Sequence, residues 1–227
     1  MNILITGASR GLGDAFSRGL GRAGDTLWLV SRNSPPSLSL EDGVRRHWIE
    51  ADLSSAGIHQ HIAASLETNL DVLIHNAGIW ESTAFSSQYD FGQVSEAETR
   101  AVLEVNLIAP ILLTQALLLK LQNSSNPKIV LIGSINGLEN SNMPEVAYSA
   151  SKFGLRGVAH ALREHLRDQK IGVTVLNPGS IAWSSNLERE DLIPPNDIVR
   201  LTRAVLETSR RTVIKEIDLP AMQESQV

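Results

Sequence analysis

The sequence predicts an α/β protein, a doubly wound parallel β-sheet of about seven strands flanked by helices, folded as a single domain over residues 1–227. Short β-rich runs alternate with longer helical patterns, as in successive βαβ units. Several of these runs, such as the one from Ile129 to Ile132, are apolar throughout, which is typical of strands covered on both faces. No linker rich in Pro, Gly or Ser divides the chain, whose 227 residues are the size of one large domain.

The strands are predicted from short runs rich in β-branched and other apolar residues. In chain order they cover residues 2–6, 26–31, 45–50, 72–75, 128–132, 172–177 and 213–218. Helices are predicted where apolar side chains recur every three or four positions, at 12–23, 55–68, 95–122, 147–169 and 197–209. Residues 33–43 stand in the place of a crossover helix, but Pro35 and Pro36 favour a loop with one short turn.

The composition predicts a folded globular protein and excludes several chemistries. Hydrophobic residues make up 42% and charged residues 20% of the chain, so a substantial core can form. The 20 Lys and Arg against 25 Asp and Glu give a net charge of −5 without a basic block, which argues against nucleic-acid and anionic-lipid partners. Cysteine is absent, and its absence excludes disulfides, thiolate nucleophiles and cysteine-based metal sites.

The sequence favours a soluble, cytoplasmic protein. The N-terminus runs directly into the strand pattern at 2–6 and lacks the basic region and apolar stretch of a signal peptide. The most apolar stretch, 107–121, has 15 residues, fewer than the roughly 20 that span a bilayer. His59 and His61 lie on a helix that we expect at the surface, without a third metal ligand nearby. We therefore expect neither a membrane partner nor a bound metal.

A glycine-rich turn joins the first strand to the first helix. Gly7, Gly11 and Gly13 have the spacing Gly-x3-Gly-x-Gly. At such a turn the backbone N–H groups and the helix dipole favour a phosphate or pyrophosphate. The glycines let the backbone approach the ligand and let the helix pack closely against the strand. Because the turn follows a strand and opens a helix, it predicts a nucleotide-binding site.

Further motifs follow the later strands or lie on two of the helices. In chain order the whole set is TGASRGLG at 6–13, HNAG at 75–78, Asn106, Ser134, YSASK at 148–152 and NPG at 177–179. Their order and spacing resemble the short-chain dehydrogenase/reductase family, with its TGxxxGxG, NNAG, YxxxK and NPG motifs. The resemblance covers residues 6–179 and implies a Rossmann-type fold. One difference is His75, which replaces the first Asn of NNAG.

The resemblance implies a catalytic set of Asn106, Ser134, Tyr148 and Lys152. Lys152 follows Tyr148 by four residues, so both share one helix face. Its charge, with that of an oxidised nicotinamide, is expected to lower the pKa of the tyrosine, which would act as acid and base in hydride transfer. Ser134 would hold the substrate oxygen. By the resemblance, Asn106 orders a water that links Lys152 to solvent, and Lys152 binds the nicotinamide ribose.

The end of the second strand distinguishes the two nicotinamide cofactors. NAD enzymes place an Asp or Glu there, whereas an Arg accommodates the 2′-phosphate of NADP. The sequence has Ser31 and Arg32 without an acid, and Arg10 adds a base in the glycine turn, so NADP(H) is favoured over NAD(H) unless both arginines are merely solvated. The expected cofactor contacts are Gly7, Ser9, Arg10, Gly11, Leu12, Gly13, Ser31, Arg32, Asp52, Leu53, Asn76, Ala77, Gly78, Tyr148, Lys152, Pro178, Gly179, Ile181 and Ser184.

Two departures from the family pattern affect the pocket. Trp183 occupies the place of a Thr in the family's PG-x-I-x-T pattern, and the following Ser184 is the candidate to supply the lost hydroxyl. The interval from Ser134 to Tyr148 is 14, which lengthens the loop between them by one residue relative to many members. Large side chains in the loops predict a pocket suited to apolar or aromatic groups, or else a cover for the core or a subunit interface. They are Trp80, Tyr89, Phe91, Met143, Trp183 and Leu187.

We expect an NADP(H)-dependent oxidoreductase that reduces a small-molecule carbonyl or oxidises the corresponding alcohol. One alternative is a nucleotide-sensing or scaffold protein of the same fold that has lost turnover, against which the intact Ser134, Tyr148 and Lys152 argue. Another is an epimerase or dehydratase, for which the short substrate loop leaves little room. The resemblance also implies a homodimer or homotetramer, formed through the helices at 95–122 and 147–169.

Overall fold

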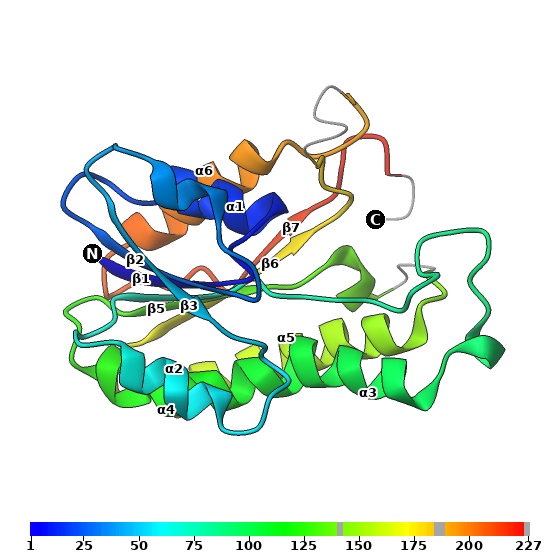
Figure 1. The fold of residues 1–227 in the computed structure, drawn as a ribbon, viewed down its shortest axis with the longest axis horizontal. Helices are drawn as coiled ribbons and strands as arrows, with labels where there is room; N and C mark the ends of the chain where they lie inside the picture. The colour runs from blue at the N-terminus through cyan, green and yellow to red at the C-terminus, as the bar shows by residue number, and fades with distance from the viewer. Residues whose placement is uncertain (140–142, 184–188, 225–227) are drawn as a thin grey trace.

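The computed structural model describes residues 1–139, 143–183 and 189–224, and Figure 1 shows its fold. Seven parallel strands form one sheet in the order β3-β2-β1-β4-β5-β6-β7. They are β1 Asn2–Thr6, β2 Thr26–Ser31, β3 Arg45–Glu50, β4 Val72–His75, β5 Lys128–Ile132, β6 Gly172–Pro178 and β7 Glu216–Leu219. The sheet grows outward from β1 in one direction and from β4 in the other, so it is doubly wound and the predicted fold class is confirmed.

The predicted strands agree closely with the observed ones. β1 to β5 begin and end at the predicted residues, and β6 is one residue longer. The four strands β1, β2, β4 and β5 are buried along almost their whole length, which explains their continuous apolar sequence. β7 begins later than predicted, because its pairing with β6 starts where the Val175 amide donates to the Lys215 carbonyl at 3.0 Å. Val213 lies before this point and is exposed.

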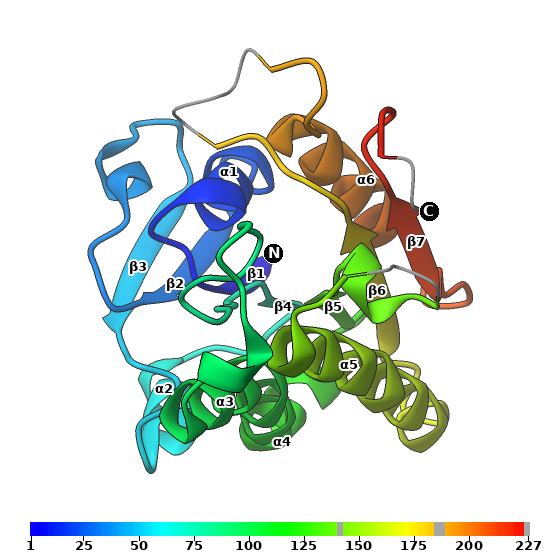
Figure 2. The same ribbon diagram turned by 90° about the vertical axis from the view of Figure 1, so that its right-hand side faces the viewer.

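Helices cover both faces of the sheet. α1 Gly11–Gly19 and α6 Pro195–Glu207 pack together on one face, as Figures 1 and 2 show. The other face carries α2 Ile58–Ser65, α3 Glu96–Leu103, α4 Ala109–Gln122 and α5 Val146–His165. Each face has its own buried apolar core. Tight covering on both sides leaves the carboxyl-terminal edge of the strands as the place where loops can build a site.

Three helices are shorter than predicted: α1, α2 and α5, which ends at His165 rather than at residue 169. α1 ends at Gly19 rather than at residue 23, where glycines at positions 19 and 21 weaken the helix. α2 begins only after Gly57, whose φ of +75° is left-handed and interrupts the predicted helix at 55–68. The single turn expected within residues 33–43 is present as a 3₁₀ turn at Pro36–Ser39.

The helix predicted at 95–122 is continuous, but its hydrogen-bonding pattern changes in the middle. A π-helical segment, Glu104–Ile108, joins α3 to α4, and the combined helix Glu96–Gln122 has 27 residues. By length and composition alone this helix could cross a membrane, so the argument made from a 15-residue apolar stretch does not hold. Leu113, Leu117 and Leu121 are fully buried against the sheet, as in a core helix of a globular domain.

The prediction that His59 lies on the surface is wrong. His59 is only 4% exposed, whereas His61 is exposed as expected. Burial lowers the pKa of His59, because a buried environment disfavours the charged ring. Among the described residues no group of three His, Cys, Asp or Glu side chains is arranged to hold a metal ion.

Candidate active site

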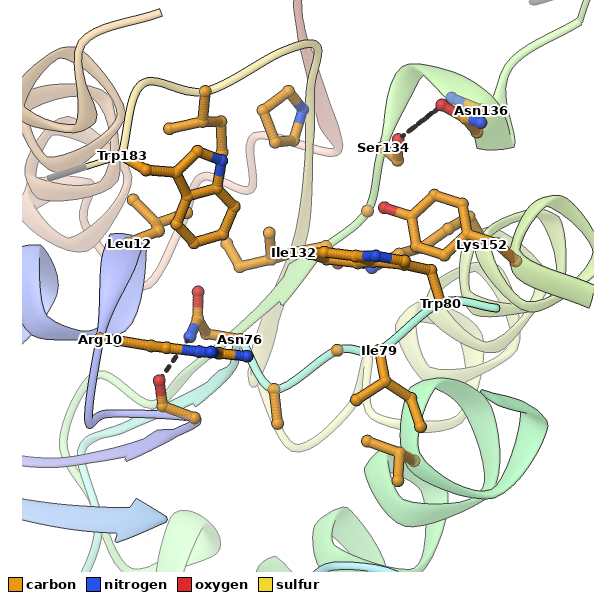
Figure 3. A pocket seen from close by; sticks show the side chains of 18 of the residues that line it. Arg10, Leu12, Asn76, Ile79, Trp80, Ile132, Ser134, Asn136, Lys152 and Trp183 are labelled. Atoms are coloured by element: carbon orange, nitrogen blue, oxygen red, sulfur yellow. Dashed lines mark hydrogen bonds between the residues drawn. The ribbon is translucent and has the colours of Figure 1, made fainter. Parts of the chain in front are cut away.

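A pocket of about 620 Å³ opens at the carboxyl-terminal ends of the strands (Figure 3). Its walls come from the turns after β1 to β6, which are far apart in the sequence and meet only at this edge. Most of the predicted site residues line it. They are Gly7, Ser9, Arg10, Leu12, Ser31, Arg32, Asp52, Leu53, Asn76, Ala77, Gly78, Ser134, Tyr148, Lys152, Pro178, Gly179 and Ile181.

The three glycines of the turn serve different geometric needs. Gly7 has a φ of +68°, and a Cβ there would lie 2.8 Å from the Ala77 Cα. A Cβ on Gly13 would lie 2.0 Å from the Gly7 carbonyl oxygen, so α1 can approach β1 only with glycine at this position. Gly11, with a φ of +55°, faces the ring of Trp183. Gly11 and Gly13 thus shape the turn without lining the pocket themselves.

Thr6 and Asn76 tie the glycine turn to the loop after β4. The Thr6 hydroxyl accepts hydrogen bonds from the Asn76 and Ala77 amides at 3.0 and 3.1 Å. The Asn76 side-chain amide donates in return to the Thr6 and Gly7 carbonyls at 3.0 and 3.2 Å. These bonds hold two walls of the pocket at a fixed separation. Thr6, which the sequence prediction did not include in the site, therefore supports both walls.

The two arginines predicted to favour NADP lie at one end of the pocket. Arg10 and Arg32 both line it and are exposed, and within the described part of the chain neither forms a salt bridge. Figure 3 shows the Arg10 side chain extended along the pocket wall beside Asn76. Asp52 is the nearby acid. Its carboxylate accepts from the Ser54 hydroxyl and amide at 2.7 and 3.0 Å, and these bonds, with the charge of Arg32, lower its pKa.

Ser134, Tyr148 and Lys152 meet in the pocket from two elements. Tyr148 and Lys152 are one turn apart on α5, and the Lys152 Nζ lies 5.4 Å from the centroid of the tyrosine ring. Ser134 follows β5. Its hydroxyl donates to the Asn136 side-chain oxygen at 3.2 Å and accepts from the Asn136 backbone amide at 3.2 Å. Lys152 donates to the Ile132 carbonyl at 2.9 Å, which anchors the ammonium beside the end of the same strand.

Asn106 lies in the π-helical segment behind the other three. Its side chain makes two hydrogen bonds of 2.8 Å with the backbone of Ile79, one as donor and one as acceptor, and it donates to the Ser151 hydroxyl at 3.1 Å. Asn106 does not line the pocket. Both Asn106 Oδ1 and Lys152 Nζ lie within 4 Å of the position that a Cβ on Gly78 would take. The π turn, a feature frequent at functional sites, directs this side chain inward.

The surroundings of Tyr148 raise its pKa to about 12. Burial is the main cause, the hydrogen bond with Ser134 acts in the opposite direction, and the charges of Glu145 and Glu81 contribute to the rise. Burial also lowers the pKa of Lys152 to about 8. The pKa of Lys152 lies below that of Tyr148, so the lysine loses its charge before the phenol ionises and does not lower the pKa of the tyrosine. At neutral pH the tyrosine is therefore a protonated phenol, the form that can donate a proton.

Glu81 and Glu145 are two buried carboxylates that sequence reasoning missed. Glu81 Oε1 accepts from the Ala147 and Tyr148 amides at 2.9 and 3.4 Å and so caps the N-terminus of α5. Glu145 accepts from the Phe85 amide at 2.9 Å and holds the loop after β4. A carboxylate is favourable at the positive end of a helix dipole. No local spacing announces Glu81, because it lies 66 residues before the helix that it caps.

Aromatic rings surround Tyr148. Trp80 contacts Phe85 and Trp183 edge to face, at centroid distances of 5.7 and 6.4 Å, and Phe85 lies 5.3 Å from Tyr148. Figure 3 shows Trp183 and Trp80 approaching from opposite walls. Of the predicted apolar residues, Trp80, Met143 and Trp183 line the pocket, whereas Tyr89 and Phe91 do not. Ser184 and Leu187 lie outside the described residues.

Comparisons with known proteins agree with this architecture. A family model for the short chain dehydrogenases matches residues 1–191. The 3-oxoacyl-(acyl-carrier-protein) reductase FabG of Aquifex aeolicus is 30% identical over 187 residues, which cover 78% of this chain and 73% of that protein. The agropine synthesis reductase of Rhizobium rhizogenes is 27% identical over 98% of this chain, and the chain spans 53% of the length of that relative. The solved structure of a metagenomic short-chain oxidoreductase in complex with NADP is 27% identical, with a TM-score of 0.82 over 98% of this chain and 97% of that one.

The fold and the pocket define a Rossmann-type oxidoreductase, and the chain belongs to the short-chain dehydrogenase family. The family model covers most of the chain, including every motif that carried the resemblance. At the level of the family, the predicted class of NAD(P)-dependent oxidoreductase is confirmed.

Proposed function

We propose that this chain, acting as one domain over residues 1–227, is an NADP(H)-dependent oxidoreductase that reduces a carbonyl compound or oxidises the corresponding alcohol. The observation that carries the proposal is the meeting of Ser134, Tyr148 and Lys152 in the pocket that the glycine turn also borders. A sensor or scaffold would need the turn but would have no use for a phenol, a hydroxyl and an amine gathered at one point.

The pocket fits a dinucleotide at several points. The turn after β1 offers backbone N–H groups at the N-terminus of α1, where an anion is favoured. We assign the pyrophosphate to Ser9 and Leu12, which line the pocket, with Gly11 shaping the turn between them, and the adenine and its ribose to Ser31, Arg32, Asp52 and Leu53. Asn76, Ala77, Gly78, Pro178, Gly179 and Ile181 border the nicotinamide end. When bound, the cofactor supplies or accepts the hydride.

Ile181 is well suited to an amide contact. It forms an isolated bridge with Ile193, in which the Ala182 amide and the Ser180 carbonyl make the hydrogen bonds, at 2.9 and 2.8 Å. The bridge fixes the start of the loop while using neither the N–H nor the C=O of Ile181. Both groups are therefore available to a carboxamide. Ser184 stays a sequence-based candidate for the pyrophosphate, because it lies outside the described residues.

The proton is handled by the chain's own residues. Ser134 donates a hydrogen bond to the substrate oxygen, for which its hydroxyl proton must turn away from the Asn136 side-chain oxygen. During reduction the Tyr148 O–H bond breaks and its proton passes to the oxygen that gains charge as the carbonyl becomes an alcohol. Lys152 binds the ribose and, once protonated, stabilises the resulting phenolate. Asn106 holds the loop at Ile79 and orders a water through which a proton passes between Lys152 and solvent.

The preference for NADP(H) rests on charge. Arg10 and Arg32 form no salt bridge within the described residues, so both are free to bind a 2′-phosphate. Asp52, whose pKa the charge of Arg32 helps to lower, already accepts two hydrogen bonds from Ser54 and is less available to a ribose hydroxyl. The similar structure named above was solved in complex with NADP, which supports the same choice.

The surface supports assembly from copies of this chain. Ile111, Leu112 and Leu119 of α4 and Phe153 of α5 are apolar side chains exposed on neighbouring helices. We propose that they are covered in a homodimer or homotetramer, and that the protein acts in the cytoplasm on a small molecule. The aromatic rings around Tyr148 favour a substrate with an apolar or aromatic group next to the carbonyl.

Titration of the purified protein with NADPH and NADH, followed by nicotinamide fluorescence, tests the proposal. We expect NADPH to bind at least about tenfold more tightly than NADH, because two charge-assisted contacts to phosphate are at stake. Arg10→Gln and Arg32→Gln should each weaken NADPH binding and leave NADH binding within about twofold. Arg203→Gln, an exposed arginine on α6, is the matched control. Equal affinity for both cofactors would reject the NADP preference, and failure to bind either would reject the proposed function.

A further inference from the structure

A second concave site lies at the opposite edge of the sheet, where β6 and β7 begin. It has a volume of about 810 Å³ and is formed by the C-terminal half of α5 with the turn after it, the starts of β5 and β6, and residues 210–216. We call it the basic cleft. Eight lysines and arginines line it against two glutamates, in a chain whose net charge is −5. Such a concentration of positive charge in a concave place is not expected from composition.

Internal pairing uses only part of this charge. Glu216 accepts from Arg156 and His160 at 3.1 Å and lies 3.6 Å from Arg163, and Glu164 is paired with Arg167. Both glutamates are therefore already engaged. Five cations of the cleft have no carboxylate partner within the described part of the chain. These are Lys128, Lys170, Arg210, Arg211 and Lys215.

The helix dipole accounts for some of the cations but not for these five. Basic residues in the last turn of a helix stabilise its negative end, and Arg163 fits this role on α5. The surplus cations come instead from β5, from the turn after α5 and from the segment before β7. Three separate parts of the chain thus direct positive charge into one cleft. Their mutual repulsion is unfavourable unless an anion occupies the space between them.

Lys128 forms part of the cleft's wall and is the most unusual of the five. The residue is 3% exposed, and its ammonium donates to the Thr208 hydroxyl at 3.0 Å and lies 3.5 Å from the Ser209 and Thr212 carbonyls. All three partners are uncharged, and burial lowers the pKa of this lysine. Gly172 makes the position possible, because a Cβ there would lie 3.0 Å from the lysine chain. These three hydrogen bonds satisfy the donors of the ammonium, but within the described residues no carboxylate balances its charge, which an anion in the cleft would do.

We propose that the basic cleft is a second binding site, separate from the cofactor pocket, for a small polyanion carrying at least two phosphate or carboxylate groups. A volume of about 810 Å³ admits a small molecule, and a buried ammonium can be reached only by a compact anionic group. Arginines and lysines around the rim bind further anionic oxygens of the same molecule. A long polyanion that stays on the surface would not reach Lys128.

Calorimetric titration with inorganic tripolyphosphate, at constant ionic strength, tests the site. The protein is first saturated with NADPH, so that the anion-binding residues of the cofactor pocket are occupied. The same titration in the Arg10→Gln/Arg32→Gln variant weakens that pocket for anions by a second route, which does not depend on the proposed function. Orthophosphate and citrate serve as further probes, the first to test the need for several anionic groups and the second to separate phosphate from carboxylate.

The variant Lys170→Gln/Lys215→Gln removes two exposed cations of the cleft. Arg100→Gln/Arg203→Gln removes the same charge from exposed positions outside it. We expect saturable binding in the wild type, weakened about tenfold or more in the cleft variant and by less than about twofold in the control. The proposal is overturned if binding disappears when the cofactor pocket is filled, or if both variants lose affinity equally. It is also overturned if the protein binds heparin, a long polyanion, but does not bind tripolyphosphate.

Discussion

The two ends of α5 have opposite chemistry. At its N-terminal end the helix carries Tyr148 and Lys152 into an apolar pocket, and Glu81 caps it with a buried carboxylate. At its C-terminal end it carries Arg163 and Arg167 into the basic cleft. Glutamates at the start and arginines at the finish follow the direction of the helix dipole. One helix thereby connects a site built from nearly neutral, buried groups to a site built from concentrated charge.

The difference shows how the same scaffold supports two kinds of binding. In the pocket, burial keeps Tyr148 protonated, with its pKa raised to about 12, and lowers the pKa of Lys152 to about 8. Groups with shifted pKa values of this kind are typical of sites that transfer protons. In the cleft, the surplus cations are exposed or hydrogen-bonded only to neutral oxygens, which suits an anionic ligand. The predictions below test whether the two ends are as independent as this contrast implies.

The largest effect is expected from Tyr148→Phe. Removing the phenol hydroxyl that we propose gives the proton should reduce turnover by about 10³-fold, within the range typical of a lost general acid. Binding of NADPH should change by less than about threefold, because the ring remains. Stopped-flow absorbance at 340 nm measures the rate of nicotinamide turnover, and calorimetry measures the affinity of the basic cleft for tripolyphosphate. A loss of anion binding in this variant would show that the two ends are coupled.

The next largest effect separates two helical glycines. Gly13→Ala places a Cβ 2.0 Å from the Gly7 carbonyl oxygen, and we expect a loss of about 2–3 kcal/mol in the free energy of unfolding. Gly157→Ala, in α5 between its two ends, meets no atom within 4 Å and should add about 0.5–1 kcal/mol. Urea unfolding of both variants provides the comparison. Equal effects would contradict the close approach of α1 to β1.

Arg156 is the physical link between the two ends of α5. It donates to the Gly137 carbonyl, in the turn that begins at Ser134, at 2.9 Å, and to Glu216 of the basic cleft at 3.1 and 3.2 Å. Arg156→Gln should cost about 1.5 kcal/mol of stability, the lower end of the range for hydrogen bonds to a charged group, because both side chains are partly exposed. Arg100→Gln, which removes an exposed ion pair, should cost less than about 0.5 kcal/mol. Thermal unfolding measures both. If Arg156→Gln lost no more stability than Arg100→Gln, the proposed structural link through Arg156 would be contradicted.

The smallest effect concerns pH. Burial is the main cause of the high pKa of Tyr148, and Glu145 and Glu81 add to it. Glu81→Gln keeps an acceptor for the helix amides but removes the charge, so the pKa of Tyr148 should fall. Alcohol oxidation needs the phenolate and should then reach half its maximal rate at a lower pH than in the wild type. Glu145→Gln should shift the profile in the same direction, and the exposed Glu96→Gln should not. An upward shift in either buried variant would contradict the electrostatic account.

The sheet could be predicted closely from the sequence. β1, β2, β4 and β5 are covered on both faces, so their apolar runs record their burial directly. The Tyr148–Lys152 pair was equally readable, since residues four apart on a helix share a face. Most of the motif-based site residues line the pocket because the turns after parallel strands meet at one edge of the sheet.

Contacts between distant segments could not be predicted. Trp183 packs on Gly11 and Glu81 caps α5 from 66 residues away, and neither contact leaves a local pattern. The π-helical segment that positions Asn106 has the sequence of an ordinary helix. The pKa of Tyr148 was expected to fall beside a charged lysine and an oxidised nicotinamide, whereas burial, which only the folded chain reveals, raises it and lowers the pKa of Lys152. The basic cleft escaped notice because its charges are spread from residue 128 to residue 216.

The most direct test of the central claim is carbonyl-dependent oxidation of NADPH by the wild-type protein. The assay follows absorbance at 340 nm with a panel of aliphatic and aromatic ketones and aldehydes, and product analysis counts the alcohol formed. The account predicts one alcohol per NADPH oxidised, with the fastest turnover for carbonyls that carry an aromatic or apolar group. Tight NADPH binding without carbonyl-dependent oxidation of any compound would contradict it and favour a nucleotide-sensing protein.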